Sequence, residues 1–360
     1  MADCLIIGGG LIGMLTAREL AQEGLDVTVM ERGVLGRESS WAGGGILSPL
    51  YPWRYPDAVT RLAAWSQRQY PYLSQTLFAQ TGIDPEWTPS GLLILDLDDR
   101  DEAMRWAGQH HVQIERLDPP LLRQAEPRLN QHFAAALLLS EVAQIRNPRL
   151  IAALRQDLIK RGVMIIEQAE AKALLTNNGR ITGIASASGV IAAGSVVIAG
   201  GAWSGDFLKA SGITLDVIPV RGQMLLYKTT PGLISHIMVS GGRYLIPRRD
   251  GHVLVGSTVE YAGFDKSTTA QAVEELRQFA VALVPDLDGC DIEKHWAGLR
   301  PGTTTGIPFI GLHPLIKGLY VNTGHYRNGV LLGPASARLL ADIMLGRPPL
   351  LDPAPYALSC

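Results

Sequence analysis

A glycine pattern near the N-terminus constrains this chain more than any other feature of its sequence. Gly8, Gly10 and Gly13 form the pattern GxGxxG, which lies between an apolar run at residues 4–9 and a helical pattern at residues 11–23. These glycines permit a tight turn, the close approach of a pyrophosphate and close helix packing, while the helix N-terminus offers unpaired N–H groups to the anion. The context predicts a dinucleotide site at the start of a βαβ unit.

Two further segments are expected at the same site. Glu31 ends an alternating strand pattern at residues 26–31, where an acid can accept hydrogen bonds from a ribose. The segment VVIAGGAWSG at 196–205 predicts a buried strand that runs into Gly200 and Gly201 and returns the chain beside the first nucleotide turn. These patterns leave both FAD and NAD open as the bound dinucleotide.

Length and composition indicate a globular α/β protein of two domains, or of one large domain with an insertion. The 360 residues exceed one ordinary core, and the 47% apolar and 18% charged residues, with 39 glycines, are typical of a globular α/β protein. The formal charge of −2 and the mixed distribution of charges provide no basic stripe for a phosphate backbone. Nucleic acid is therefore not expected as a partner.

The cysteine content and the hydropathy of the chain indicate its cellular compartment. Cys4, Cys290 and Cys360 are widely spaced and form no CxxC pair, so we expect neither a disulfide framework nor a metal site. No stretch approaches the roughly 18 apolar residues that a membrane span needs, and the N-terminus lacks a positively charged leader region. We expect a cytoplasmic protein without stable membrane association.

Local signals place the main helices. The clearest is at residues 147–162, where Asn147 is the predicted N-cap, Pro148 lies in the first turn and Gly162 ends the helix. The segment 36–56 is rich in Gly, Ser, Pro and aromatic residues and predicts an ordered, irregular loop, which at this length is usually functional. Further helices are predicted at residues 57–80, 270–283 and 329–346.

The order of the elements predicts an α/β fold with a discontinuous nucleotide-binding domain. Hydrophobic α/β segments occur at both ends and in the middle of the chain, with antiparallel-looking segments between them. We expect a Rossmann-like domain and a second, substrate-binding domain built on a mainly antiparallel sheet. The predicted boundaries are 1–85, 145–219 and 296–360 for the first domain, and 86–144 and 220–295 for the second.

Five motifs in consistent order resemble the D-amino-acid oxidase family of flavoproteins. They are GxGxxG, GRESSWAGGGILSP at 36–49, AGGAWSG at 199–205, GLRPGTTTGIPFIG at 298–311 and GHYRNGVLLGPA at 324–335. The last two are far more specific than the first. The resemblance extends from Leu5 to Leu345 and is greatest to the glycine oxidases of that family. It implies that the cofactor is FAD, held by the Rossmann-like domain.

The resemblance also implies which residues contact FAD. Backbone atoms at Ala171 would hold the adenine, and Gly329 opens a predicted helix whose positive end could stabilise the negative charge of a reduced flavin. The implied set is Gly8, Gly10, Leu11, Ile12, Gly13, Glu31, Arg32, Ser39, Ser40, Gly43, Gly44, Gly45, Ile46, Ala171, Gly200, Gly201, Trp203, His325, Tyr326, Arg327, Asn328, Gly329, Val330 and Leu331.

One sequence position predicts whether FAD is attached covalently. The related sarcosine oxidases attach their flavin through a cysteine at a position that corresponds here to Gly298. Cys290 lies earlier in the chain and does not replace it. We therefore expect dissociable, non-covalent FAD.

Two arginines and one tyrosine are the candidate catalytic and substrate-binding residues. A guanidinium can bind a carboxylate through two parallel hydrogen bonds, which lysine cannot reproduce. A lone arginine more often forms a surface ion pair. By the resemblance, however, Arg300 in GLRPG, Arg327 in HYRNG and Tyr244 in GRYLIP bind the substrate carboxylate. The expected reaction oxidises glycine or a small amine with O2. The resemblance further implies a homo-oligomer, dimer or tetramer, and supply of glycine imine to thiazole synthesis for thiamine.

Several alternatives stay open at this point. A sarcosine oxidase, a broader D-amino-acid oxidase and a dehydrogenase that passes electrons to a quinone would share these motifs. The paired arginines argue against a non-catalytic FAD-binding protein, and the single dinucleotide fingerprint argues against an NAD-dependent reductase. Arg248 and Arg249 are interpreted as a solvated strand end. The aromatic residues of the 36–56 loop either line the entrance or pack within the loop: Trp41, Tyr51, Trp53 and Tyr55.

Overall fold

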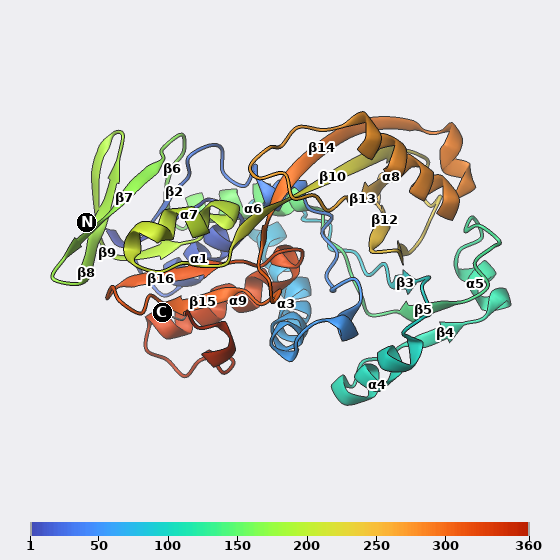
Figure 1. The fold of residues 1–360 in the computed structure, drawn as a ribbon, viewed down its shortest axis with the longest axis horizontal. Helices are drawn as coiled ribbons and strands as arrows, with labels where there is room; N and C mark the ends of the chain where they lie inside the picture. The colour runs from blue at the N-terminus through green and yellow to red at the C-terminus, as the bar shows by residue number, and fades with distance from the viewer. Residues whose placement is uncertain (1, 359–360) are drawn as a thin grey trace.

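The computed structural model describes residues 2–358, and its first eight-stranded sheet is mostly parallel (Figure 1). The strands of this sheet are β1 (Ala2–Ile7), β2 (Val27–Met30), β6 (Met164–Ile166), β7 (Ala171–Asn177), β8 (Arg180–Ser186), β9 (Gly189–Ile198), β15 (Phe309–Leu312) and β16 (Leu319–Thr323). Their order is β15–β16–β9–β1–β2–β6, and the β7–β8 hairpin is attached to β9. The central strand β1 is parallel to β2 and β9, with Cys4 opposite Val27 and Ser195.

Helices cover one face of this sheet and form the main core with it. They are α1 (Leu11–Gln22), α3 (Asp57–Thr81), α6 (Asn147–Lys160) and α9 (Gly329–Met344). Met14, Leu154 and Leu340 of these helices are fully buried together with Ile6 of β1. Buried strands with helices packed against them account for the continuous apolar runs of the sequence. The short helices α2 (Ser39–Ala42) and α7 (Ser204–Leu208) border the same unit.

The second eight-stranded sheet is mainly antiparallel. Its strands are β3 (Leu92–Ile94), β4 (Glu115–Leu117), β5 (Ala136–Leu139), β10 (Ile218–Lys228), β11 (Ile237–Ser240), β12 (Arg243–Pro247), β13 (His252–Gly256) and β14 (Asp291–Gly302). Only β3 and β11 pair in parallel among the pairs of this sheet within residues 2–358. The helices of this unit are α4 (Arg100–His110), α5 (Pro119–Ala125) and α8 (Ala270–Leu283). The two sheets confirm the predicted α/β fold class with a Rossmann-like unit.

Two details differ from the sequence-based predictions. The boundary predicted between residues 295 and 296 falls inside β14, which continues to Gly302; we propose that the second domain includes this whole strand. Asn147 is the first residue of α6 and not its N-cap, which is Arg146; the Asn147 side-chain amide instead donates to the carbonyl of Ser40 at 2.8 Å. Among residues 2–358, no helix has both the length and the apolar character needed to cross a bilayer.

Candidate functional site

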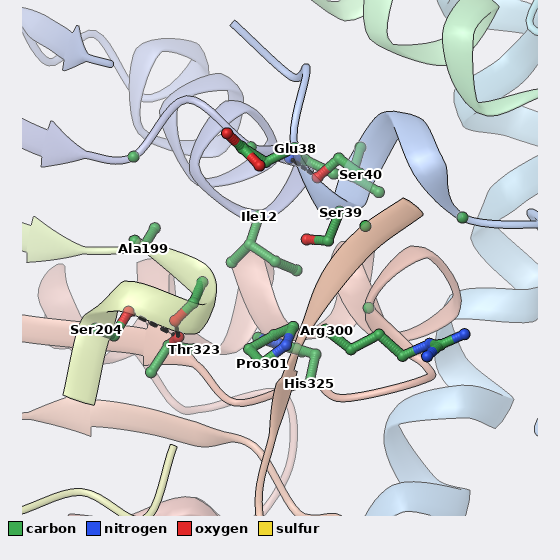
Figure 2. Close-up of a pocket in the computed structure, with 18 of the residues that line it drawn as sticks. Ile12, Glu38, Ser39, Ser40, Ala199, Ser204, Arg300, Pro301, Thr323 and His325 are labelled. Atoms are coloured by element: carbon green, nitrogen blue, oxygen red, sulfur yellow. Dashed lines mark hydrogen bonds between the residues drawn. The ribbon is translucent and has the colours of Figure 1, made fainter. Parts of the chain in front are cut away.

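A cavity of about 500 Å³ lies where the two units meet, and residues of both sheets line it. Every residue predicted to contact FAD or substrate borders this cavity except Gly13 and Leu331. Figure 2 shows Ser40 on one side of it and His325 on the other. Segments from both ends and the middle of the chain therefore meet in one site.

The glycine turn between β1 and α1 forms one wall of the cavity. Gly8 has a φ of +107°, and a Cβ atom there would lie 2.4 Å from the carbonyl oxygen of Ala199. A Cβ atom on Gly13 would lie 2.0 Å from the carbonyl oxygen of Gly8, so Gly13 serves close packing of α1 and not the cavity surface. Leu331 is 1% exposed, packs into the core beside α1 and does not border the cavity.

Glu31 follows β2 and holds the glycine turn. Its buried carboxylate accepts hydrogen bonds from the backbone N–H groups of Gly9 and Gly33, both at 2.8 Å. Because each carboxylate oxygen can accept more than one hydrogen bond, Glu31 retains capacity for a ribose hydroxyl. Beside it, the N–H of Leu11 donates to Ser40 Oγ at 2.8 Å at the positive end of α1, which favours a pyrophosphate.

An aromatic stack borders the same end of the cavity. The Arg32 guanidinium lies 3.6 Å from the ring centre of Trp203, and Trp203 stacks on Phe264 with 5.4 Å between ring centres. Lys266, in the same loop as Phe264, pairs with Glu38 at 3.0 Å. Cation–π and stacking contacts of this kind fix large side chains in place. The loop that follows β13 is thereby held against the nucleotide-binding unit.

The glycine wall, which we define as Gly43–Ile46, borders the cavity, and we propose from the family resemblance that the isoalloxazine lies against Gly44, Gly45 and Ile46. Gly45 has a φ of +80°, and a Cβ atom there would lie 2.0 Å from the carbonyl oxygen of Ile145. The N–H of Ile145 donates to the Gly45 carbonyl at 2.8 Å, and the N–H of Leu47 donates to the Ala143 carbonyl at 2.9 Å. The wall needs glycine because two backbone segments pack directly against each other.

The N-terminus of α9 borders the cavity from the opposite side. This helix begins at Gly329, and its N-cap residue, Asn328, makes no side-chain capping bond. The buried Nδ2 of Asn328 has no partner within residues 2–358. His325 bonds Ser336 Oγ at 3.0 Å, and burial lowers the pKa of His325 to about 3, so the imidazole is neutral at pH 7. A free donor and a positive helix end fit a flavin that gains negative charge on reduction.

Arg300 reaches the cavity from β14. Its guanidinium donates to Ser257 Oγ at 2.6 Å and to the carbonyl of Thr258 at 3.2 Å. It occupies space left by Gly222 of β10, where a Cβ atom would lie 2.1 Å from both terminal nitrogens. Burial lowers the pKa of Arg300, and the neighbouring Arg327 guanidinium lowers it further. A bound carboxylate would offset both effects.

Arg327 enters from the segment between β16 and α9. Its Nη2 donates to the carbonyl of Gly242 at 2.8 Å. Within the described chain, neither Arg327 nor Arg300 pairs with an Asp or Glu side chain. Buried arginines are normally paired. Two unpaired guanidiniums that border one cavity therefore mark a site for an anion.

Tyr244 lies on β12 and borders the same cavity as the two arginines. Its side chain is 8% exposed, and its hydroxyl donates to Met224 Sδ at 3.3 Å. A Cβ atom on Gly256, opposite on β13, would lie 2.5 Å from the tyrosine ring. A thioether is a weak acceptor, so the hydroxyl is available to a carboxylate. We call Tyr244, Arg300 and Arg327 the anion pocket.

The structure corrects the interpretation of Arg248 and Arg249. Arg249 is exposed, but Arg248 turns inward and donates to the carbonyl of Gly44 at 2.7 Å and to Gln144 Oε1 at 2.6 Å. Sequence reasoning also missed Gly222, which borders the cavity beneath Arg300. A lone glycine inside a strand pattern was the available signal for a close approach there.

None of the four aromatic residues of the 36–56 loop borders the cavity, and Trp41 and Tyr55 pack against the main core. Tyr51 and Trp53 are 5% and 6% exposed and do not border the cavity. The Tyr51 hydroxyl donates to Asp96, the Trp53 indole N–H donates to Asp99, and burial raises the pKa of Tyr51. These two residues pack within the loop and do not line an entrance.

Comparisons with known proteins agree on one family. The chain matches the DAO family model, described as FAD dependent oxidoreductase, over residues 3–343. A glycine oxidase of Pseudomonas aeruginosa is 51% identical over 354 residues, which cover 98% of this chain and 97% of that protein. A bifunctional protein ThiO/ThiG of Synechocystis is 33% identical over 351 residues, covering 96% of this chain and 52% of that protein.

A solved structure gives the same result. The crystal structure of glycine oxidase from Geobacillus kaustophilus matches with a TM-score of 0.95 and 30% sequence identity, and the match covers 99% of this chain and 98% of that one. Fold, site and sequence thus agree along nearly the whole length. This chain belongs to the DAO family of FAD-dependent oxidoreductases.

Proposed function

We propose that this protein oxidises glycine and other small amines with bound FAD. The observation that carries the proposal is the anion pocket, in which two guanidiniums without carboxylate partners and a tyrosine hydroxyl border one end of a cavity. The glycine turn and Glu31 border the other end. A relative named glycine oxidase, at 51% identity, supports glycine as the first substrate to test.

The residues of the anion pocket would act by positioning. Arg300 and Arg327 would bind the substrate carboxylate, and Tyr244 would donate a hydrogen bond to it. When bound, FAD would supply the oxidising chemistry, namely hydride transfer from the substrate Cα to flavin N5, with O2 as the final electron acceptor and hydrogen peroxide as the product. Hydrolysis of the released imine balances the reaction: glycine, O2 and water give glyoxylate, ammonia and hydrogen peroxide. Once the amine is neutral, no side chain has to abstract a proton.

We propose non-covalent attachment of FAD. At Gly298, a Cβ atom would lie 2.5 Å from the Cβ of Ala42, so this position has no room for a cysteine in the present packing. Cys290 does not border the cavity. Acid precipitation should therefore give a colourless pellet and a yellow supernatant. Flavin colour that stays with the denatured chain would contradict this attachment.

A substrate panel tests the proposed function against its alternatives. Glycine, sarcosine and D-alanine would be compared by peroxide formation in air and by dye reduction without oxygen. We expect glycine to give the highest kcat/KM, and anaerobic glycine to bleach the bound flavin. Preference for sarcosine or D-alanine would assign another oxidase of this family, and dye reduction without peroxide would assign a dehydrogenase. A flavin that no substrate bleaches would indicate a non-catalytic FAD-binding protein.

We also propose that the glycine imine feeds thiazole formation in thiamine synthesis. The similarity to a protein named ThiO/ThiG, about half of whose length (52%) this chain covers, supports this proposal. The predicted homo-oligomer is a separate proposal. Sedimentation of the FAD-loaded protein would distinguish a monomer from the expected dimer or tetramer.

A further inference from the structure

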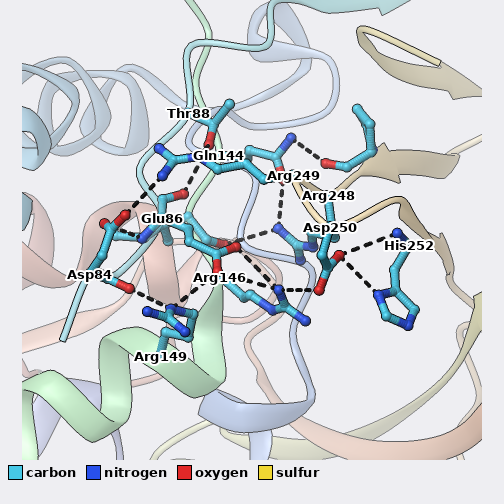
Figure 3. Close-up of polar contacts among 12 residues, drawn as sticks. Asp84, Glu86, Thr88, Gln144, Arg146, Arg149, Arg248, Arg249, Asp250 and His252 are labelled. Carbon is cyan, nitrogen blue, oxygen red and sulfur yellow. Dashed lines mark hydrogen bonds and ion pairs between the residues drawn. The ribbon is translucent and has the colours of Figure 1, made fainter. Parts of the chain in front are cut away.

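Arg248 is a half-buried cation that the proposed reaction leaves without a role. It follows β12, the strand that carries Tyr244, and its guanidinium turns toward the glycine wall. Nη2 donates to the Gly44 carbonyl at 2.7 Å, while Nη1 donates to Gln144 Oε1 at 2.6 Å and to the Ile145 carbonyl at 3.3 Å. Figure 3 shows Arg248 within a group of polar contacts that joins the two units.

The neighbouring carboxylates are engaged by another arginine. Arg146 pairs with Glu86 at 3.2 Å and with Asp250 at 2.7 Å, whereas no carboxylate within residues 2–358 pairs with Arg248. Burial and the charge of Arg146 lower the pKa of Arg248 to about 10, so the side chain is still a cation at pH 7. A buried charge held by neutral oxygens alone is costly. Its retention at this position points to a function.

The contact with Gly44 fixes one peptide group of the glycine wall. The Gly44–Gly45 peptide is trans, so its N–H points opposite to the carbonyl that Arg248 holds. No acceptor within the described residues bonds the Gly45 N–H, and Gly45 borders the cavity. Gly44 is also confined by its neighbours, because a Cβ atom there would lie 2.8 Å from Ile246 Cδ1 and 3.1 Å from Tyr244 Cε2.

We propose that Arg248 is a positioning residue for the flavin: by binding the Gly44 carbonyl, it fixes and polarises the peptide whose Gly45 N–H faces the isoalloxazine. A hydrogen bond to a carbonyl strengthens the N–H of the same peptide as a donor. The half-buried cation also favours negative charge in the cavity. This inference rests on the proposed placement of the isoalloxazine against the glycine wall.

Sulfite binding tests the inference without turnover. Sulfite adds to N5 of an oxidised flavin and leaves the ring negatively charged, so its affinity reports on donors and positive charge beside the ring. We expect the sulfite dissociation constant to rise at least tenfold in Arg248→Met and at least threefold in Arg248→Lys, which keeps the charge but loses the forked donors. The FAD dissociation constant of the apoprotein should rise in the same order. The KM for glycine at saturating FAD should stay within threefold, because the anion pocket is unchanged.

Arg249→Met is the matched control. Arg249 has the same side chain at the next position but is exposed and pairs with Asp84 at 2.8 Å, so both dissociation constants should stay within twofold of the wild type. If Arg248→Met does not fold, the sulfite affinity of Arg248→Lys alone tests the proposal. A sulfite constant within twofold of the wild type in either folded Arg248 variant overturns the proposal, as does an equal loss in Arg249→Met. A wild type that binds FAD and sulfite but does not oxidise glycine would contradict the proposed substrate and leave this test intact.

Discussion

At the scale of single residues, Arg327 tests the anion pocket most directly. Its one hydrogen-bond partner within the described chain is the carbonyl of Gly242, so Arg327→Ala removes a substrate contact and breaks no ion pair. A charge-assisted hydrogen bond contributes about 1.5–3 kcal/mol, and we therefore expect kcat/KM for glycine to fall about tenfold or more. Peroxide assays would measure this, with Arg100→Ala, which breaks an exposed pair with Asp101, as the control. A wild-type kcat/KM in Arg327→Ala would show that Arg327 does not bind the substrate carboxylate.

Gly222 tests the placement of Arg300 without altering its charge. In Gly222→Ala the new methyl group would lie 2.1 Å from the guanidinium nitrogens, so Arg300 must move away from its position in the anion pocket. We expect the KM for glycine to rise about tenfold, the order expected for loss of one charged contact, while FAD affinity changes little. Gly108→Ala, on α4 with nothing within 4 Å of the added atom, is the control. An unchanged KM would show that Arg300 does not depend on this space.

At the scale of elements, the contact between the glycine wall and the segment at Ile145 sets the position of the cavity surface. Gly45→Ala would place a methyl group 2.0 Å from a carbonyl oxygen at a φ of +80°. The backbone conformation alone should lower the free energy of unfolding by about 1–3 kcal/mol, and the clash should add to it and weaken FAD binding. Gly24→Ala shares the conformation, with a φ of +85°, but has nothing within 4 Å. Urea unfolding of both variants separates the cost of the backbone conformation from the cost of the clash. An equal loss of unfolding free energy in Gly45→Ala and Gly24→Ala would argue against the close contact at Gly45.

Elements with local signals could be predicted from the sequence. The helix expected at residues 57–80 spans Asp57–Thr81, because Gly82 adopts the left-handed conformation that ends it. The helix expected at residues 270–283 spans exactly these positions as α8, where the Thr269 side chain caps it. Asn147 was predicted as an N-cap for the same local reasons, but the carbonyl of Ser40 takes its side chain instead. A distant partner thus outweighed the local preference.

Contacts between distant segments could not be predicted in this way. Arg248 and Arg249 precede the same turn and have the same chemistry, but Arg248 turns inward to distant acceptors, which include the Gly44 carbonyl 204 positions away, whereas Arg249 is exposed. The family motifs did identify residues that border the cavity, because each motif specifies a backbone geometry. Gly222 lies in a strand without such a motif, and its role depends on the Arg300 side chain from the neighbouring strand β14.

At the scale of the whole molecule, Asp250 links the two units and makes their association sensitive to acid. It accepts hydrogen bonds from the Arg146 guanidinium, before α6, at 2.7 Å and from the backbone N–H of His252, on β13, at 3.3 Å. Burial alone would raise the pKa of Asp250, but these hydrogen bonds outweigh it and lower the pKa to about 2. An unfolded aspartate titrates near 3.9, so the contact stabilises the fold above about pH 4 and is lost as the pH falls through about 2.

The lowered pKa of Asp250 predicts a difference in acid stability between the wild type and Asp250→Asn. Between about pH 5 and pH 2, the free energy of unfolding should fall more steeply in the wild type than in Asp250→Asn, because the variant has no carboxylate to protonate at this contact. Urea unfolding at a series of pH values would measure both slopes. Parallel slopes would show that Asp250 does not contribute to the acid sensitivity.

The order of strands in the first sheet also governs how the chain is made. The ribosome delivers β1, β2 and α1 first, but β1 pairs with β9, β9 pairs with β16, and α9 completes the core in which α1 is buried. Because α9 (Gly329–Met344) lies far behind α1 (Leu11–Gln22) in the sequence, it emerges from the ribosome long after α1. The nascent polypeptide must therefore keep the apolar side of its first βαβ unit from aggregating until α9 has emerged, and only then can the coenzyme be captured.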